Sequence, residues 1–174
     1  SSGSGKSTLL RLLLGFDQPE SGRVLYDSKD LVGLNINAVR RQIGTVLQNG
    51  RLNSGSIFEN IANHVQVSHS EAWEAAADAG LSDDIDQMPM GIHTVVAEGG
   101  ANLSGGQRQR LLIARALVTR PKMVFFDEAT SALDSKTEKE VITTISRLDR
   151  DLTILMIAHR ASTLQNCDTI VHLK

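Results

Sequence analysis

Apolar runs of strand length lie near both ends of the chain. Residues 43–47, 123–126 and 152–158 are largely apolar, which is typical of strands that are buried on both faces of a parallel sheet. Two shorter runs, at residues 23–26 and 169–173, predict further strands. The pattern therefore predicts a sheet that is built from the first and the last parts of the sequence.

Helix signals alternate with these strands. Residues 9–14 are almost all leucine and are followed by Gly15, so we expect a helix that ends at this glycine. Further helices are predicted at residues 35–41, 135–148 and 161–166. Strands and helices in alternation predict an α/β fold with a mostly parallel sheet.

The middle of the chain, residues 49–118, has helix signals and little strand signal. A capping box, in which a serine and a glutamate three residues later cap each other's backbone, predicts a helix start. Such boxes occur at Ser56 and Glu59, at Ser68 and Glu71, and outside this region at Ser135 and Glu138. The acidic residues Asp83, Asp84 and Asp86 lack calcium-loop spacing and predict a solvated turn. We expect residues 49–118 to form a helical subdomain inserted into a sheet protein.

Composition narrows the function classes. The 174 residues are 41% hydrophobic, enough for one core, and 18 basic against 20 acidic residues give a net charge of −2. This balance gives no electrostatic basis for non-specific nucleic-acid binding. The sequence has neither a membrane-span run nor a signal peptide. Its single cysteine excludes an internal disulfide, and its five histidines lack metal-ligand spacing.

The first eight residues, SSGSGKST, match the second half of a phosphate-binding loop. Glycines let backbone N–H groups turn toward an anion, lysine follows the β- and γ-phosphates, and the serine hydroxyl suits Mg²⁺. The residues expected at the nucleotide are Ser2, Gly3, Ser4, Gly5, Lys6, Ser7 and Thr8. The motif's first glycine would precede Ser1, so we expect the chain to be cut inside the motif. The alternative is a Gly/Ser linker before a lysine.

Polar residues follow two of the predicted strands. Asp127 and Glu128 come directly after residues 123–126, and Gln48 follows residues 43–47. An aspartate at this place is suited to hold Mg²⁺ together with Ser7, and an adjacent glutamate to accept a proton from attacking water. Two carboxylates here also fit a solvated strand end or a helix N-cap, and a glutamine here fits a plain loop.

Residues 103–110, LSGGQRQR, start a predicted helix that continues to Pro121. Ser104 is a suitable N-cap, and Gly105 and Gly106 leave N–H groups uncovered for an anion. The glycines alone would fit a simple cap. The whole string, however, resembles the signature motif of ATP-binding cassette (ABC) proteins, and the chain resembles the nucleotide-binding domain of an ABC transporter.

This resemblance implies a role for several positions. Gln48 corresponds to the Q-loop glutamine, which contacts Mg²⁺ and the attacking water in the family. Asp127 and Glu128 correspond to the Walker B aspartate and the catalytic glutamate. His159 corresponds to the switch histidine that senses the γ-phosphate, although by itself it fits an ordinary strand end. Asp134 lies in the segment that matches the D-loop, which crosses the dimer interface.

The resemblance also implies a fold and an assembly. It predicts a P-loop NTPase (RecA-like) core, residues 1–48 and 119–174, incomplete at both ends, with the inserted α-helical signature subdomain at residues 49–118. It implies ATP and Mg²⁺ as cofactors, transmembrane domains as partners and a place on the cytoplasmic face of a membrane. A second nucleotide-binding domain would bind head to tail and offer Ser104, Gly105, Gly106 and Gln107 in trans.

Finer similarity indicates the exporter branch. Residues 96–100 resemble the exporter X-loop, whose glutamate, here Glu98, faces the coupling helices of the membrane domains. Residues 54–61 are similar to the exporter segment beyond the Q-loop, and residues 48–50 and 88–91 resemble peptide or bacteriocin exporters. The sequence departs from the pattern where Ala97 replaces a glycine and where Asn-Gly-Arg replaces an Asp-Pro-Phe type of sequence. The cargo stays open.

Two alternatives remain at this point. A soluble ABC-type ATPase of DNA repair or chromosome organisation would need a basic surface or long coiled-coil insertions, and the sequence offers neither. A degenerate module that uses ATP only to hold a dimer together would not need the glutamate and histidine expected for hydrolysis.

Overall fold

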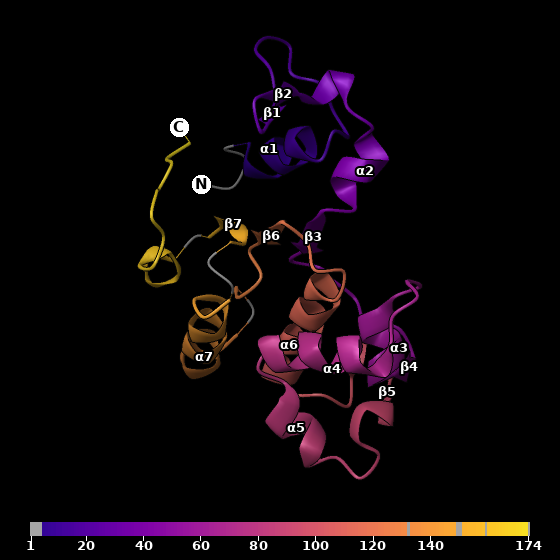
Figure 1. Cartoon of the computed structure of the whole chain (residues 1–174). Helices are drawn as coiled ribbons and strands as arrows, with labels where there is room; N and C mark the ends of the chain where they lie inside the picture. Colours follow the sequence, from indigo (N-terminus) through magenta and orange to yellow (C-terminus); the bar gives the residue numbers. More distant parts are fainter. Residues whose placement is uncertain (1–4, 132, 149–150, 159, 174) are drawn as a thin grey trace.

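A parallel three-stranded sheet forms the centre of the protein in the computed structural model, which describes residues 5–131, 133–148, 151–158 and 160–173. Its strands are β3 (Ile43–Val46), β6 (Met123–Asp127) and β7 (Thr153–Ile157), in the order β3-β6-β7 (Figure 1). Val46 of β3 lies opposite Phe126 of β6, and Asp127 of β6 lies opposite Ile157 of β7. The parallel sheet predicted from the apolar runs is confirmed.

The central strand β6 is covered on both faces. Phe125 points to the face on which helix α1 (Lys6–Leu13) lies, where it packs with Leu10 and Ile157. Its neighbours Val124 and Phe126 belong to the larger hydrophobic cluster on the opposite face. The continuous apolar run of β6 therefore has the burial that was predicted. Strand β3 instead alternates, with buried and exposed positions in turn.

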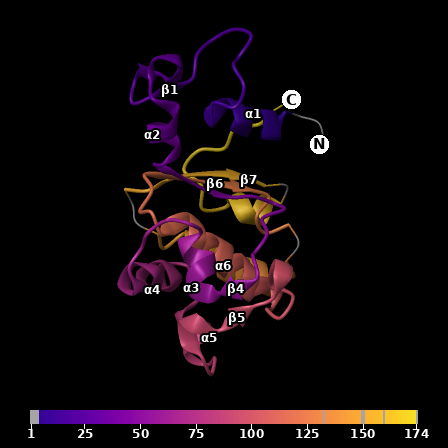
Figure 2. The same ribbon diagram turned by 90° about the vertical axis from the view of Figure 1, so that its right-hand side faces the viewer.

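The layer on the α1 face is small and irregular. It contains the hairpin β1 (Leu25–Tyr26) and β2 (Lys29–Asp30), the 3₁₀ turn η1 (Leu31–Gly33) and helix α2 (Ile36–Arg40), grouped above the sheet in Figures 1 and 2. The Arg40 guanidinium donates to the carbonyls of Leu14 and Gly15 at the end of α1. Strand 23–26 is thus shorter than predicted and belongs to a separate hairpin.

Helices lie on the opposite side of the sheet. They are α3 (Ile57–Ala62), α4 (His69–Asp78), α5 (Ser82–Asp86), α6 (Gly105–Leu117) and α7 (Ser135–Ile145). Of these, α6 packs against β3, and the helices α4 and α5 lie farther away (Figures 1 and 2). Two short strands, β4 (Gly55–Ser56) and β5 (Val95–Val96), pair antiparallel among them, next to the turns η2 (Gly91–His93) and η3 (Glu98–Gly100). No helix in the described ranges is long and apolar enough to cross a membrane.

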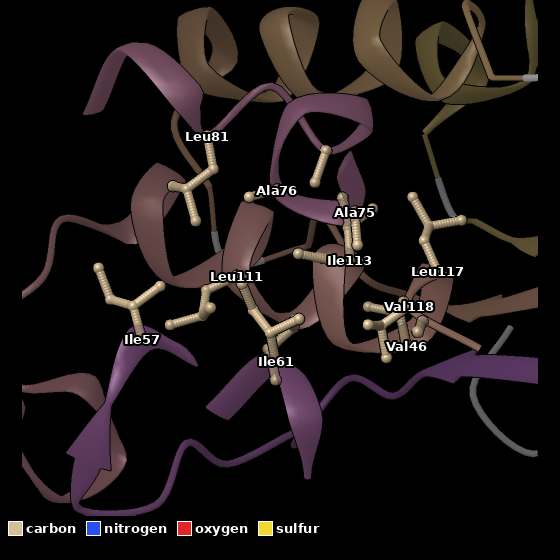
Figure 3. Packing of buried hydrophobic residues seen from close by; sticks show 14 of the residues in the cluster. Val46, Ile57, Ile61, Ala75, Ala76, Leu81, Leu111, Ile113, Leu117 and Val118 are labelled. Atoms are coloured by element: carbon tan, nitrogen blue, oxygen red, sulfur yellow. The ribbon is translucent and has the colours of Figure 1, made fainter. Parts of the chain in front are cut away.

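Helix α6 is the axis of the main hydrophobic cluster. Leu111 and Ile113 are fully buried, and Figure 3 shows them among side chains from α3, α4 and β3. Both capping boxes predicted for this region are confirmed, because Ser56 with Glu59 and Ser68 with Glu71 start α3 and α4. The same cluster extends to the sheet, so α6 ties the helices of residues 49–118 to β3 and β6.

Two predictions near the end of the chain are wrong. The capping box at Ser135 does not form, because Asp134 is the N-cap of α7 and accepts from the N–H groups of Lys136 and Thr137. No strand is assigned at residues 169–173 within the described part, where no neighbouring strand pairs with this segment. The preceding helix is the short 3₁₀ turn η4 (Ala161–Leu164).

A buried amide joins the segment after β3 to helix α6. Asn60, 2% exposed, accepts from the Asn53 N–H at 2.9 Å and from Arg115 Nη2 at 2.7 Å, and donates to the carbonyls of Asn53 and Ser56. Burial lowers the pKa of Arg115, whose Nη1 also donates to the Arg51 carbonyl at 2.8 Å. The chain between Gln48 and α3 is therefore fixed to α6 by polar contacts.

Asn60→Leu is expected to lower the free energy of unfolding by about 2–3 kcal/mol, because it removes the acceptor of Arg115 Nη2 and of the Asn53 N–H in a buried place. Denaturant unfolding monitored by circular dichroism measures this loss. The control is Asn37→Leu, the same change at an exposed helical position, which should change the stability by less than about 0.5 kcal/mol. Equal effects of the two changes would contradict the importance of the buried network.

Candidate functional site

The carboxyl ends of β3 and β6 bring two predicted site residues into contact. Gln48 follows β3 and donates from Nε2 to Glu128 Oε2 at 3.1 Å, across 80 positions of sequence. Neighbouring parallel strands place their following residues at one edge of the sheet, which is where ligands bind in open α/β sheets. An amide and a carboxylate that were predicted separately therefore form one pair.

The backbone at Glu128 makes a sharp turn. Glu128 has φ +49°, which is uncommon for a residue with a side chain. Its N–H donates to the Ile157 carbonyl at 3.0 Å, and its own carbonyl accepts from Ser131 at 3.0 Å. Sparsely populated backbone angles of this kind concentrate at functional sites. The turn fixes Glu128 at the end of β6 instead of leaving it on a loose strand end.

Asp127 lies between an acidic and a basic neighbour. Burial raises its pKa, the charge of Glu128 raises it further, and the positive charge of Lys6 opposes both; the net direction is upward. The charge of Lys6, at the start of α1, therefore acts on the end of β6. The negative charge of the two carboxylates is complementary to a cation, and the positive charge of the lysine is complementary to phosphates.

The N-terminus of α1 has the geometry predicted for an anion site. Gly5 is its N-cap with φ +82°, in the left-handed region that favours glycine. Lys6 is the first helical residue and is half-buried, and Ser7 and Thr8 follow it on the exposed first turn. The remaining three predicted residues, Ser2, Gly3 and Ser4, lie outside the described residues.

The residues proposed for Mg²⁺ fit a hard cation. Asp127 offers a carboxylate, Ser7 a hydroxyl and Gln48 a side-chain carbonyl, all of them oxygen ligands. No group of three or more His, Cys, Asp or Glu side chains suited to a metal occurs in the described ranges. This donor set therefore suits an ion that keeps phosphate and water ligands, as Mg²⁺ does in nucleotide sites.

The signature segment lies on another face. Ser104 caps α6 in a capping box with Gln107, whose Nε2 also donates to Asp84 Oδ1 at 2.9 Å. Arg110 donates to the other oxygen of Asp84 at 2.7 Å. Since α6 and α1 cover opposite faces of the sheet, the signature does not join Lys6 within one chain.

The start of α6 packs against the first turn of α7. A Cβ on Gly106 would lie 2.8 Å from Thr137 Cγ2, so only glycine permits this approach. Asp134 accepts from the hydroxyl of the same Thr137 at 2.6 Å. This hydrogen bond is the main reason why the pKa of Asp134 is lowered. The predicted signature and D-loop residues are therefore neighbours.

Glu98 occupies a third location. It is exposed at the start of η3, in a loop that Asn102 holds by accepting from the Ala97 N–H and donating to the Val95 carbonyl, both at 2.8 Å. The Gly99 N–H donates to Leu52 at 2.9 Å. Glu98 thus lies on a braced loop near the segment that follows Gln48.

His159 lies outside the described residues, two positions beyond the end of β7. Two acidic residues, Asp84 and Glu138, make ion pairs that the sequence pattern did not predict. Asp84 belongs to helix α5 and pairs with α6, so the prediction of a solvated acidic turn is wrong there. Glu138, assigned to a capping box, is instead buried and pairs with Arg160. Both acidic residues bind partners more than 20 positions away.

Comparisons with known proteins agree on one family. A sequence profile described as "ABC transporter" matches residues 1–131. The alpha-hemolysin translocation ATP-binding protein HlyB of Escherichia coli O157:H7 is 48% identical over 171 residues, 98% of this chain and 24% of that protein. The leukotoxin translocation ATP-binding protein LktB of Mannheimia glucosida is 49% identical over 171 residues, with the same coverage of both chains.

A solved structure gives the same result for the fold. The structure described as "Structure of a bacterial Atm1-family ABC exporter with ATP bound" has a TM-score of 0.83 and 41% sequence identity. The match covers 94% of this chain and 29% of that chain. The chain spans about a quarter of the length of the curated relatives it matches.

Proposed function

The chain belongs to the ABC transporter family, and on this premise we propose that it is the domain of an exporter that binds and hydrolyses ATP to power transport across a membrane. The observation that carries the proposal is the group formed at one edge of the sheet by Lys6, Gln48, Asp127 and Glu128. An ATP-binding role is supported by the relatives named as ATP-binding proteins and by the similar exporter with ATP bound.

The proposed chemistry is phosphoryl transfer to water. Lys6 and the first N–H groups of α1 bind the β- and γ-phosphates, with Ser2, Gly3, Ser4, Gly5 and Thr8 lining the same loop. Bound Mg²⁺, held by Ser7 and Asp127 with Gln48 nearby, supplies charge that neutralises the phosphate oxygens. Glu128 accepts a proton from the attacking water, Gln48 orients the Glu128 carboxylate, and His159 contacts the γ-phosphate.

The proposed assembly needs two copies. The N-terminus of α6 is formed by Ser104, Gly105, Gly106 and Gln107, and its glycines leave backbone N–H groups uncovered. It lies on the opposite face of the sheet from α1. A second nucleotide-binding domain, bound head to tail, would bring its own signature to this chain's Lys6, and Asp134 would lie at that interface. Residues 1–48 and 119–174 then act as the ATP-binding core, and residues 49–118 as the signature subdomain.

The proposed partners beyond the dimer are transmembrane domains. Glu98 on its braced loop faces their coupling helices, so the ATPase works on the cytoplasmic face of the membrane. The cargo we propose is a toxin-like polypeptide, in line with the resemblance to peptide or bacteriocin exporters and with the names of the relatives. Nucleic acid is not a partner in this proposal, because the net charge of −2 gives no electrostatic basis for non-specific binding to it.

Lys6→Ala is expected to weaken ATP binding by about a hundredfold, because it removes a charge-assisted contact to phosphate oxygens. Equilibrium binding of a fluorescent ATP analogue to the full-length protein measures the change. The control is Lys29→Ala, which removes an exposed lysine in the β1–β2 hairpin and should leave binding within about twofold. Unchanged binding after Lys6→Ala would refute the phosphate site. Binding of DNA to the full-length protein at physiological salt would instead favour the alternative ABC-type ATPase of DNA repair or chromosome organisation.

A further inference from the structure

Buried polar side chains of the described residues gather beside the site. Four polar or charged residues in the described part of the chain are buried, and two of them, Thr130 and Thr163, donate to a third, Glu138. They come from three different segments: the turn after β6, helix α7 and the 3₁₀ turn η4. None of the three has a role in the proposed chemistry.

Glu138 is the common acceptor of this cluster. Its Oε1 accepts from Thr163 Oγ1 at 2.9 Å and from Thr130 Oγ1 at 3.4 Å, and its Oε2 accepts from Arg160 Nη1. The side chain is 4% exposed. Burial raises the pKa of Glu138, but the bonds from Arg160 and Thr163 outweigh burial and the net direction is downward. Both oxygens of the carboxylate therefore accept hydrogen bonds from other segments.

A buried ion pair is a weak source of stability, because desolvation offsets much of the attraction and apolar replacements are often as stable. Its geometry is more informative than its energy. Thr130 is two residues from Glu128. It lies in the turn that is closed by the hydrogen bond from the Ser131 N–H to the Glu128 carbonyl. Arg160 directly follows position 159 in the sequence. One carboxylate thus holds the segments that follow both β6 and β7.

We infer that Glu138 is a positioning residue for the proposed hydrolysis: by binding both Thr130 and Arg160, it fixes the turn that carries Glu128 relative to the segment that follows β7. The inference rests on the proposed function. Proton acceptance by Glu128 requires placement of its carboxylate to a fraction of an ångström, and misplacement by about 1 Å costs about a hundredfold in rate. Binding of ATP, which depends on Lys6 and α1, does not pass through this cluster.

The test compares kcat, KM and melting temperature of variants of the full-length protein in an assay of ATP-dependent phosphate release. Glu138→Gln should lower kcat about tenfold or more and leave KM within about threefold. Rates are taken below the melting temperature and per molecule that binds a non-hydrolysable ATP analogue, which removes any loss of folded protein. Glu140→Gln, the same change at an exposed position of α7, should leave all three quantities unchanged.

Variants of Arg160, which forms the ion pair with Glu138, separate the effect of positioning from the effect of charge. Arg160→Ala should lower kcat as Glu138→Gln does, Arg160→Lys should recover most of the loss, and the double variant should be no slower than either single variant. Additive losses, or a kcat of Glu138→Gln within twofold of wild type, would overturn the inference and leave the proposed function standing. A wild-type protein that hydrolyses no ATP would overturn both.

Discussion

Glu128→Gln is expected to lower the rate of ATP hydrolysis by about a hundredfold to ten-thousandfold, because the amide cannot accept the proton of the attacking water. The change keeps the size of the side chain, so the turn at φ +49° and its bond to Ile157 are retained. ATP binding should stay within about threefold, since Lys6 and α1 are untouched. Phosphate release by the full-length protein and binding of the nucleotide measure the two quantities.

The same variant should also strengthen the ATP-bound dimer. When hydrolysis is slow, ATP stays between the two copies and the closed state accumulates. Size-exclusion chromatography with ATP and Mg²⁺ detects this as a shift toward the dimer, which wild type shows only transiently. Glu140→Gln serves again as the matched control. Hydrolysis at the wild-type rate would exclude Glu128 as the base, whatever the dimer does.

The edge of the sheet could be predicted from the sequence because its rules are local. An apolar run followed at once by a polar residue marks the end of a buried strand, as at Gln48 and Asp127. A glycine and a lysine before a leucine-rich run predict a helix start with a glycine N-cap, as is found at Gly5 and Lys6. The family resemblance read from the signature residues is confirmed by the family profile and by the relatives.

The buried polar clusters could not be predicted, because their members are distant in sequence. Glu138 binds side chains 22 and 25 positions later, and Asp84 binds side chains 23 and 26 positions later. Local patterns were misleading at both places. A serine three residues before Glu138 suggested a capping box, yet Asp134 is the better acceptor for the first N–H groups of α7.

These pairs of residues, which are distant in sequence, connect segments whose relative positions matter for the proposed reaction. Asp84 fixes Gln107 and Arg110 at the start of the signature helix, and Gly106 brings that helix against Thr137 of α7. Helix α7 in turn carries Glu138, which holds the turn next to Glu128. These contacts therefore form a continuous set from the signature segment to the turn that carries Glu128.

Gly44→Ala tests the packing that supports the other half of the site, and we expect it to be strongly destabilising. A Cβ on Gly44 would lie 2.4 Å from the carbonyl oxygen of Ala116 in α6, and a backbone atom inside a buried helix has no low-energy way to move aside. Overpacking of this kind costs about 1–3 kcal/mol. For a domain of this size that corresponds to a fall of about 2–4 °C in melting temperature per kcal/mol.

The clash also has a functional consequence that distinguishes it from general instability. Separating β3 from α6 displaces Gln48, which follows β3 four positions after Gly44, from Glu128. Gly44→Ala should therefore lower the hydrolysis rate per folded molecule as well as the melting temperature. Gly33→Ala is the matched control, because no atom lies within 4 Å of its added Cβ. If the two alanine variants have equal melting temperatures and equal rates of ATP hydrolysis, the close contact between β3 and α6 does not support the site.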